Sequence, residues 1–155
     1  MNENKTPTLY VMVGISGSGK TTFAKKMGCP VVSTDRIREK LFGDERNQAE
    51  PSKVFHRAYK TLNWFMRNGL DVVFDATNTT HRGRRQIIRA VRYPCKRVAV
   101  LMPTDLDKAL RQNQGRDRNV PEDVIRRQYM QLIRDGESIP TQFDDVIFVK
   151  ETAVI

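Results

Sequence analysis

Short apolar segments recur along the chain and alternate with longer, more polar ones. The apolar, β-prone segments occupy 8–13, 30–33, 70–74, 96–102 and 146–149. They are nearly continuous apolar runs, which are typical of strands buried on both faces of a parallel sheet. The pattern therefore predicts a parallel sheet of about five strands.

The segments between these strands are predicted to be helices, over 21–27, 34–42, 51–68, 82–92, 105–112 and 121–134. In the longest, apolar residues recur at helical spacing, Pro51 suits the first turn, and Asn68-Gly69 suits the end. Thr34 or Asp35 is expected to cap the second helix. Strands that alternate with helices imply an α/β fold with helices on both faces of the sheet.

No linker, repeat or low-complexity tract interrupts this alternation, so residues 1–155 are predicted to form a single domain. A chain of this length can bury roughly 70% of its unfolded surface, which is enough for a full core. The polar, glycine-containing run from Gln112 to Val120 is the exception and reads as a mobile connection. We expect a lid at about 112–121.

Composition excludes several classes of protein. The longest apolar stretches are far shorter than the roughly 20 residues of a membrane span, and the N-terminal MNENKTPT has no signal-peptide character, so a cytoplasmic protein is expected. Cys29 and Cys95 lack metal-site spacing and are expected to be buried small apolar residues. His56 and His81 are the only histidines, which excludes zinc hydrolases and most nucleophilic hydrolases.

The net charge of +9 favours encounter with polyanions. Charge alone does not identify the polyanion, and a generic basic surface that aids solubility is an equally good interpretation. The motifs must decide between them.

Residues 14–21, GISGSGKT, match G-x-x-x-x-G-K-[ST] between a predicted strand and a predicted helix, which is the context of a phosphate-binding loop. The glycines let successive N–H groups face a phosphate, and the helix adds the positive end of its dipole. Lys20 is expected to neutralise β- and γ-phosphate oxygens, and the Thr21 hydroxyl to ligate Mg²⁺. The predicted ATP-binding residues here are Gly14, Ser16, Gly17, Ser18, Gly19, Lys20, Thr21 and Thr22.

Polar residues follow the second predicted strand, at the edge where ligands of parallel sheets bind. Asp35 begins a helix, and Arg38 follows one turn later on the same face. Asp35 can accept the proton of an attacking hydroxyl, and Arg38 can hold an acceptor phosphate through its planar fork. The alternative is structural, with Asp35 as a cap and Arg38 as a solvated helix residue.

The third predicted strand ends in Asp75, followed by Thr77 and Asn78. Asp75 has two functional interpretations, as part of the Mg²⁺ shell or as an acceptor contact, and one structural one, as a helix cap. Thr77 and Asn78 are candidate acceptor-binding residues. The following basic run from His81 to Arg85 can attract nucleic-acid phosphates, but such runs are more often solvated helix faces.

The polar run before Pro121 carries Arg111, Arg116 and Arg118. Phosphoryl transfer needs positive charge around the transferring oxygens, and a mobile loop can bring arginines to them as it closes. A surface loop with ordinary ion pairs is the alternative.

In this order the pieces resemble the 5′-hydroxyl polynucleotide kinases of phage and bacterial nucleic-acid repair, within the small P-loop kinases. The motifs are GISGSGKTT, STDRIREKLFG, VVFDATNTTHRGRR and NQGRDRNVPEDVIRRQYMQL, which span nearly the whole chain. The resemblance implies a three-layer P-loop kinase fold with an arginine-bearing lid. It also implies that Asp35 is the general base for the 5′-hydroxyl, that Arg38 contacts the acceptor's phosphate, and that Asp75 belongs to the acceptor site.

The resemblance further assigns Arg116 to the donor phosphates, with Lys20, Asp35 and Arg116 as the catalytic set. A second lid arginine is expected just before Asn113, where this chain has Gln112, so Arg111 or Arg118 must substitute. Mg²⁺ is the implied cofactor, with ATP and a DNA or RNA 5′ end as substrates. A repair partner such as a ligase would be a separate protein, self-association is possible, and a phage-encoded chain would act in the host-cell cytoplasm.

Two other functions fit the motifs. A small-molecule kinase for a nucleoside, sugar or antibiotic shares the fold, although the charge and Arg38 favour a polyanionic acceptor. A nucleotide-dependent nucleic-acid-binding switch would use ATP without transfer, and would have no use for a base at Asp35.

Overall fold

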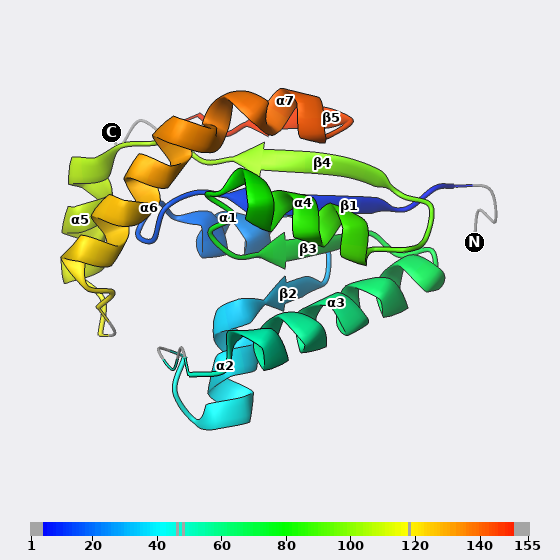
Figure 1. Cartoon of the computed structure of the whole chain (residues 1–155), viewed down its shortest axis with the longest axis horizontal. Helices are drawn as coiled ribbons and strands as arrows, with labels where there is room; N and C mark the ends of the chain where they lie inside the picture. Colours follow the sequence, from blue (N-terminus) through cyan, green and yellow to red (C-terminus); the bar gives the residue numbers. More distant parts are fainter. Residues whose placement is uncertain (1–4, 46, 48, 118, 151–155) are drawn as a thin grey trace.

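Strands and helices alternate along the chain in the order that the sequence predicts (Figure 1). The computed structural model describes residues 5–45, 47, 49–117 and 119–150. The elements are β1 (Thr8–Val13), α1 (Lys20–Lys26), β2 (Val31–Ser33), α2 (Thr34–Phe42), α3 (Pro51–Arg67), β3 (Val72–Asp75), α4 (His81–Ala90), β4 (Lys96–Leu101), α5 (Leu106–Gln114), α6 (Glu122–Asp135), the 3₁₀ turn η1 (Gly136–Ser138), α7 (Ile139–Gln142) and β5 (Asp145–Phe148).

The strands form one parallel sheet in the order β2-β3-β1-β4-β5, which confirms the predicted sheet. Leu9 in β1 lies opposite Val72 in β3 and Arg97 in β4. β1 and β3 are neighbours in the sheet. The connection that follows β1 leads toward β2, and the connection that follows β3 leads toward β4, so the two connections run in opposite directions from the carboxyl ends of these strands. This divergence opens a crevice that binds ligands in α/β sheets.

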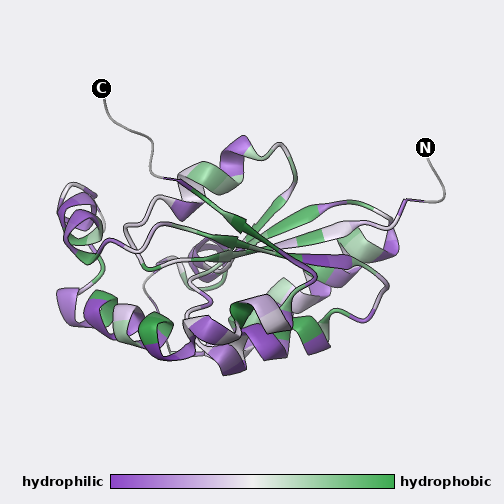
Figure 2. Ribbon diagram, turned by 90° about the horizontal axis from the view of Figure 1, so that it is seen from above, coloured by the Kyte–Doolittle hydropathy of each residue, from purple (hydrophilic) through white to green (hydrophobic). Residues whose placement is uncertain are grey.

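Helices cover both faces of the sheet, as predicted, and Figure 2 shows the sheet between α1 on one side and α3, α4 and α6 on the other. Successive residues of β1 point to opposite faces. Val11 joins the core with Leu62 and Ile87, whereas Met12 joins the smaller core with Ala24 of α1. No helix among the described residues has the length and apolar composition of a membrane span.

A third apolar cluster lies under the predicted lid. Ile15, Ala109 and Ile125 are buried against one another, and they come from the loop after β1, from α5 and from α6. The two helices that carry the lid are therefore packed directly on that loop.

Several boundaries differ from the predictions for local reasons. Ser33 caps α2 by accepting the N–H of Arg36, because this helix begins directly at the end of β2. The strand predicted at 70–74 begins only at Val72, since the Asp71 carboxylate accepts the N–H of Thr8 at 2.8 Å instead. The short helix α7 was not predicted, because four residues have no periodicity to read.

Both cysteines are half-buried rather than fully buried as expected. They pack at the edges of the two larger apolar clusters, Cys95 on one face of the sheet and Cys29 on the other. Burial raises the pKa of both thiols, which keeps them protonated and unreactive at neutral pH.

One arginine of the basic run His81–Arg85, at the start of α4, is buried. Arg84 is 0% exposed, and its guanidinium donates to the carbonyl oxygens of Asn78 at 2.8 Å and Asp135 at 2.6 Å. Its Nε donates to Gln142 Oε1 at 2.8 Å. Arg84 is therefore not part of a solvated face, which corrects the interpretation of the run as uniformly exposed, and it ties the loop after β3 to the end of α6.

Arg84→Met is expected to destabilise the fold by about 3 kcal/mol, because it leaves buried carbonyl groups without a donor. The measurement is urea unfolding, where the midpoint falls while the slope stays constant. Arg85→Met is the control, since Arg85 is exposed and its replacement should change stability by no more than about 0.5 kcal/mol. Equal midpoints for the two variants would contradict a structural role for Arg84.

Candidate active site

The loop between β1 and α1 has the backbone that its glycines allow. Gly17 and Gly19 have φ angles of 84° and 88°, in the left-handed region that other residues rarely adopt. A Cβ on Gly17 would also overlap the carbonyl oxygen of Ala109 in α5. The loop can therefore lie against α5 only with glycine at this position.

The loop leads directly into the N-terminus of α1, with Gly19 as the residue before the helix. Among the described residues, no side chain caps that helix, so the positive end of its dipole faces the crevice. The N–H of Ser16 donates to Gln128 Oε1 at 2.8 Å, and the N–H of Ser18 donates to the Ile15 carbonyl at 3.1 Å. A loop of this shape at a helix N-terminus is suited to an anion such as a triphosphate.

Lys20 begins α1 and lies among charges from three other elements. Burial lowers the pKa of Lys20, Asp75 and Asp35 raise it, and Arg116 lowers it, with burial the largest effect. Asp75 ends β3, Asp35 lies in α2, and Arg116 lies in the loop after α5. Asp75, Asp35 and Arg116, which were predicted for three parts of the site, thus all influence the pKa of Lys20.

Thr21 and Asp75 provide two oxygen ligands side by side. The Thr21 hydroxyl donates to Asp75 Oδ2 at 2.9 Å, and Asp75 is only 4% exposed. A hydroxyl and a carboxylate are oxygen donors of the kind that Mg²⁺ prefers, with phosphate oxygens and water completing its shell. Asp75 does not cap the next helix, because Thr80 does so by accepting the N–H of Gly83 at 3.0 Å. Thr22 follows in α1 and is exposed.

Asp35 and Arg38 form an ion pair on α2, with Arg38 Nη1 2.9 Å from Asp35 Oδ1. The Arg38 side chain is 11% exposed and the Asp35 side chain 57% exposed. The buried Nε of Arg38 has no hydrogen-bond partner among the described residues. The pair therefore presents an open carboxylate beside a guanidinium that is held in place with donor capacity remaining.

The residues after β3 hold that loop against the phosphate-binding loop. The Thr77 carbonyl accepts the N–H of Gly14 at 3.0 Å. The buried amide of Asn78, which has a φ of 50°, donates to the Met12 carbonyl at 2.7 Å. These bonds give Thr77 and Asn78 a structural part, and direct contact with an acceptor stays a prediction.

The predicted lid is shorter than 112–121 because α5 continues to Gln114. The buried side chain of Asn113 closes the remaining loop, donating to the Val120 carbonyl at 2.7 Å and accepting the Val120 N–H at 2.9 Å. Arg116 is exposed within this loop, and Arg111 is exposed in the last turn of α5. Arg118 lies outside the described residues, so the choice of second lid arginine remains open.

Two glutamines of α6 contact the site and were missed by sequence reasoning. Gln128 accepts the N–H of Ser16, and Gln131 Oε1 accepts the Thr79 hydroxyl at 2.6 Å. They lie three residues apart, which puts them on one face of the helix. The helix that follows the lid is thereby bonded to both the phosphate-binding loop and the loop after β3. Helical spacing of two polar residues was the only available signal, and it is too common to single them out.

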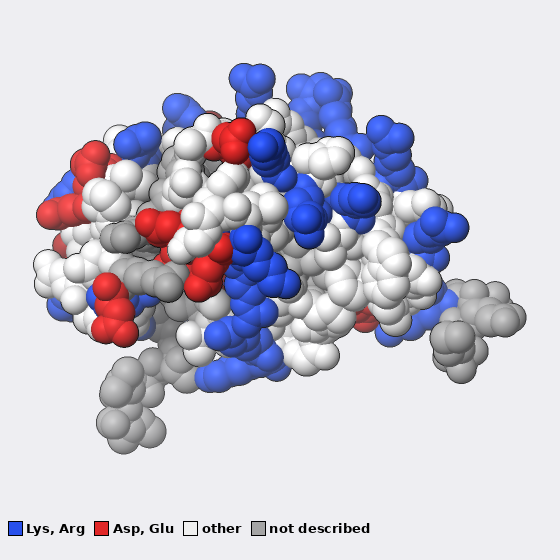
Figure 3. Space-filling view, turned by 90° about the horizontal axis from the view of Figure 1, so that it is seen from below, with Lys and Arg blue, Asp and Glu red and all other residues white. Residues whose placement is uncertain are grey.

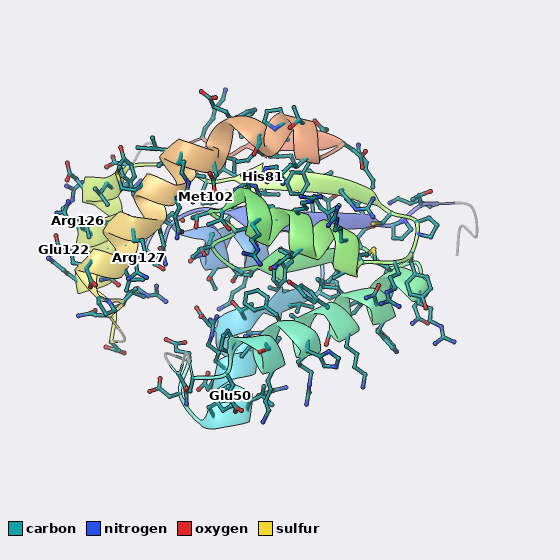
Figure 4. All side chains as sticks on the ribbon, viewed as in Figure 1. Glu50, His81, Met102, Glu122, Arg126 and Arg127 are labelled. Carbon is teal, nitrogen blue, oxygen red and sulfur yellow. The ribbon has the colours of Figure 1, made fainter. Side chains whose placement is uncertain are left out.

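Arg116→Ala is expected to lower kcat by about 10²-fold or more with little change in acceptor KM, if the lid arginine stabilises charge in the transition state. Arg126→Ala is the control, because Arg126 is an exposed arginine on the adjacent α6 that pairs with Glu122 at 2.7 Å (Figure 4). Steady-state kinetics with varied acceptor measure both. A change confined to acceptor affinity would instead assign Arg116 to the acceptor.

Arg111→Ala, measured in the same way, tests whether Arg111 is the second lid arginine. A loss of kcat comparable with that of Arg116→Ala would identify it.

The fold is shared with solved P-loop kinases. A chain in the structure of the Pnkp1/Rnl/Hen1 RNA repair complex aligns with a TM-score of 0.79 at 20% identity, over 89% of this chain and 48% of that one. A gluconokinase from Sinorhizobium meliloti aligns at 0.56 and 16% identity, over 94% and 83% of the two chains. A shikimate kinase from Acinetobacter baumannii aligns at 0.57 and 18%, over 96% and 87%. This chain thus spans about half the length of the repair-complex chain.

Residues 9–137 match the model of a family described as AAA domain. The matched range begins in β1 and ends in η1, so it contains the phosphate-binding loop, Asp35, Asp75 and the lid. This range is more than half of the chain, and the fold and the phosphate-binding loop agree with it. The chain therefore belongs to the AAA domain family of P-loop proteins, with the fold of the P-loop kinases.

Proposed function

We propose that this chain is a kinase that transfers the γ-phosphate of ATP to the 5′-hydroxyl end of a polynucleotide. The observation that carries the proposal is the Asp35–Arg38 pair on α2, in which an exposed carboxylate lies 2.9 Å from a mostly buried guanidinium. Asp35 also raises the pKa of Lys20. Phosphoryl transfer to the 5′ end of a polynucleotide needs a carboxylate that accepts the hydroxyl proton and a cation that holds the neighbouring phosphate. Asp35 and Arg38 are groups of these two kinds.

The residues divide the reaction between two sides of the crevice. The phosphate-binding loop and Lys20 hold the triphosphate, with the loop's N–H groups and the α1 dipole opposing its charge. The oxygen of the 5′-hydroxyl attacks the γ-phosphorus while Asp35 accepts the proton of that hydroxyl. The bond between the γ-phosphorus and the oxygen that joins it to the β-phosphate breaks, and ADP leaves. Arg116 in the lid balances charge on the transferring oxygens.

Thr21 and Asp75 would hold Mg²⁺, which would reduce the negative charge of the triphosphate when bound. This assignment uses Asp75 for the metal and leaves Arg38, with Asp35, as the acceptor contact. Thr77 and Asn78 then act by holding in place the loop that follows Asp75 at the end of β3.

A small-molecule kinase is the second candidate, and the gluconokinase and shikimate kinase alignments favour it. Those kinases align over most of both chains, whereas the repair-complex chain is about twice as long as this one. Against it stands the charge of +9, for which a neutral metabolite has no use. Association with separate repair proteins such as a ligase is part of the first proposal only.

Transfer from labelled ATP to bare nucleosides, to 3′-phosphorylated nucleosides, and to small sugars and shikimate tests the proposal. If Arg38 grips the phosphate 3′ to the reacting nucleotide, a 3′-phosphorylated nucleoside is expected to be the smallest good acceptor. The remote phosphate also orients the hydroxyl against Asp35, so its loss should lower kcat as well as raise KM.

Arg38→Ala is expected to erase most of this preference, and Arg38→Lys to restore it only partly, because an ammonium lacks the bidentate fork. The comparison of two enzymes with two acceptors gives the coupling between Arg38 and the phosphate directly. Arg36→Ala is the control, since Arg36 is an exposed neighbour on the same helix. Wild-type protein that phosphorylates bare nucleosides as fast as 3′-phosphorylated ones would rule out the polynucleotide proposal and favour the small-molecule kinase.

A further inference from the structure

Helices α3 and α4 form a basic surface away from the phosphate-binding loop. Neither helix contains an aspartate or glutamate. Their exposed basic residues are Lys53, Arg57, Lys60, Arg67, Arg82, Arg85 and Arg89. Figure 3, which views the molecule from the side of α2 and α3, shows blue side chains over much of this surface and most of the red ones gathered at the left.

The absence of acidic residues is unusual for helix N-termini, where the dipole favours negative charge. The first turn of α4 instead begins with His81 and Arg82, and the first turn of α3 contains Lys53. Acidic residues just outside the two helices serve their N-termini, since Glu50 pairs with Lys53 at 3.3 Å and Asp135 accepts the N–H of His81 at 3.0 Å. Within the helices all the acidic or basic side chains are basic, and the exposed ones suit contact with a polyanion.

A groove of about 730 Å³ runs between these two helices. The rings of Phe55 and Tyr59 line it from α3, with centroids 5.9 Å apart, and Gln86 and Arg89 line it from α4. At one end Asn63 ties the helices together, donating to the Ala90 carbonyl at 2.9 Å and accepting the N–H of Arg92 at 2.9 Å. The lined part of α3 lies on the N-terminal side of this tie, toward the loop that joins α3 to α2.

A second hollow connects this groove with the helix that carries the Asp35–Arg38 pair. It shares Ser52 and His56 with the groove and reaches Leu41 on α2. Leu41 lies one turn beyond Arg38, and Asp35 to Leu41 spans about 9 Å along the helix. The second hollow therefore extends the groove to the C-terminal end of α2, the helix whose first turns carry Asp35 and Arg38.

We propose that the α3–α4 groove binds single-stranded polynucleotide, and specifically the part of the acceptor that lies 3′ of the phosphorylated end. Bases contact the aromatic side chains of Phe55 and Tyr59, while Arg89 and the flanking Lys60 neutralise backbone phosphates. A polynucleotide carries flat apolar rings and regularly spaced phosphates, which match both features. An acidic peptide supplies the charge but nothing for the aromatic surface. The choice of which end enters the site rests on the proposed kinase function.

Charge reversal tests the groove without depending on catalysis. The variant Lys60→Glu/Arg89→Glu changes both helices, and Lys25→Glu/Lys26→Glu makes the same change in net charge on α1, on the other face of the sheet. All four residues are exposed, and equal melting temperatures would show that both variants fold. The probe is a fluorescently labelled single-stranded oligouridylate decamer, and its anisotropy measures binding.

We expect the groove variant to bind the decamer about tenfold more weakly, or weaker still. The slope of log K against log salt concentration should become less negative by about 1.4, because two phosphate contacts are lost. The α1 variant should bind nearly as the wild type does.

Equal weakening in both variants would overturn the proposal, because it would show a general effect of net charge. Poly-glutamate that competes with the decamer as well as unlabelled decamer does would also overturn it, in favour of an acidic protein partner. Kinase assays separate the two proposals. If the groove variant keeps the wild-type KM for the decamer, the kinase stands and the groove fails. If no 5′-hydroxyl acceptor is phosphorylated but binding is lost only in the groove variant, the groove stands and the kinase fails.

Discussion

Lys20→Ala is expected to abolish measurable phosphoryl transfer to every acceptor. The ammonium lies half-buried between the phosphate-binding loop and the carboxylates of Asp75 and Asp35. Its removal takes away the positive charge that Lys20 would place on the β- and γ-phosphate oxygens. Loss of one preorganised charge at a phosphoryl-transfer site costs about 10²–10³ in kcat, and weaker ATP binding adds to this.

Single-turnover kinetics with saturating ATP measure the chemical step, and calorimetric titration of ATP measures binding. Lys26→Ala is the matched control, because Lys26 is an exposed lysine on the same helix, in its last turn. Thr21→Ala should also lose activity. It should need a higher Mg²⁺ concentration for half-maximal rate, because Thr21 pairs with Asp75 in the predicted metal shell and its hydroxyl is lost. Near-normal turnover of Lys20→Ala would mean that the donor site lies elsewhere.

Asp35→Asn is expected to lower kcat by about 10²–10⁴ while ATP binding stays unchanged, because an amide cannot take the proton of the 5′-hydroxyl. The substitution preserves shape, and Ser33 rather than Asp35 caps α2, so the helix should remain intact. The cap therefore separates catalysis from structure at this position. Equal urea midpoints for Asp35→Asn and wild type would confirm that the loss is chemical.

Asp123→Asn is the control, since Asp123 is an exposed carboxylate in the first turn of α6. The measurement is single-turnover transfer to a 3′-phosphorylated nucleoside, with ATP affinity determined separately. Weakened ATP binding with an unchanged chemical step would make Asp35 a structural residue. Arg38→Ala is expected to differ from Asp35→Asn in this assay, because the proposal assigns Arg38 to the acceptor's phosphate, so that the defect should depend on that phosphate.

The sheet could be predicted from the sequence because a strand buried on both faces consists of consecutive apolar residues. Runs such as residues 8–13 are nearly continuous apolar segments, which are typical of strands in a parallel sheet covered on both faces. The phosphate-binding loop was equally predictable, since the glycines at 17 and 19 serve backbone angles that no other residue adopts easily. In both cases the information lies within a few consecutive residues.

The contacts that join the site's separate loops could not be read from the chain. Gln128 reaches Ser16 and Gln131 reaches Thr79, in each case from a helix far along the sequence. Asn113 closes the lid loop, because its side-chain amide pairs with the backbone of Val120 across that loop. A polar side chain has the same appearance in sequence whether it meets water or a backbone group, and only the packing of the helices decides which.

Arg84 and Arg89 show the same limit most clearly. Both are arginines of α4, yet Arg84 is fully buried among carbonyl groups and Arg89 lines an open groove. The sequence by itself determined that this segment is helical and positively charged. Tertiary structure decided which arginine faces the end of α6 and which faces α3, because burial is set by the neighbouring elements, and those are brought together only when the sheet forms.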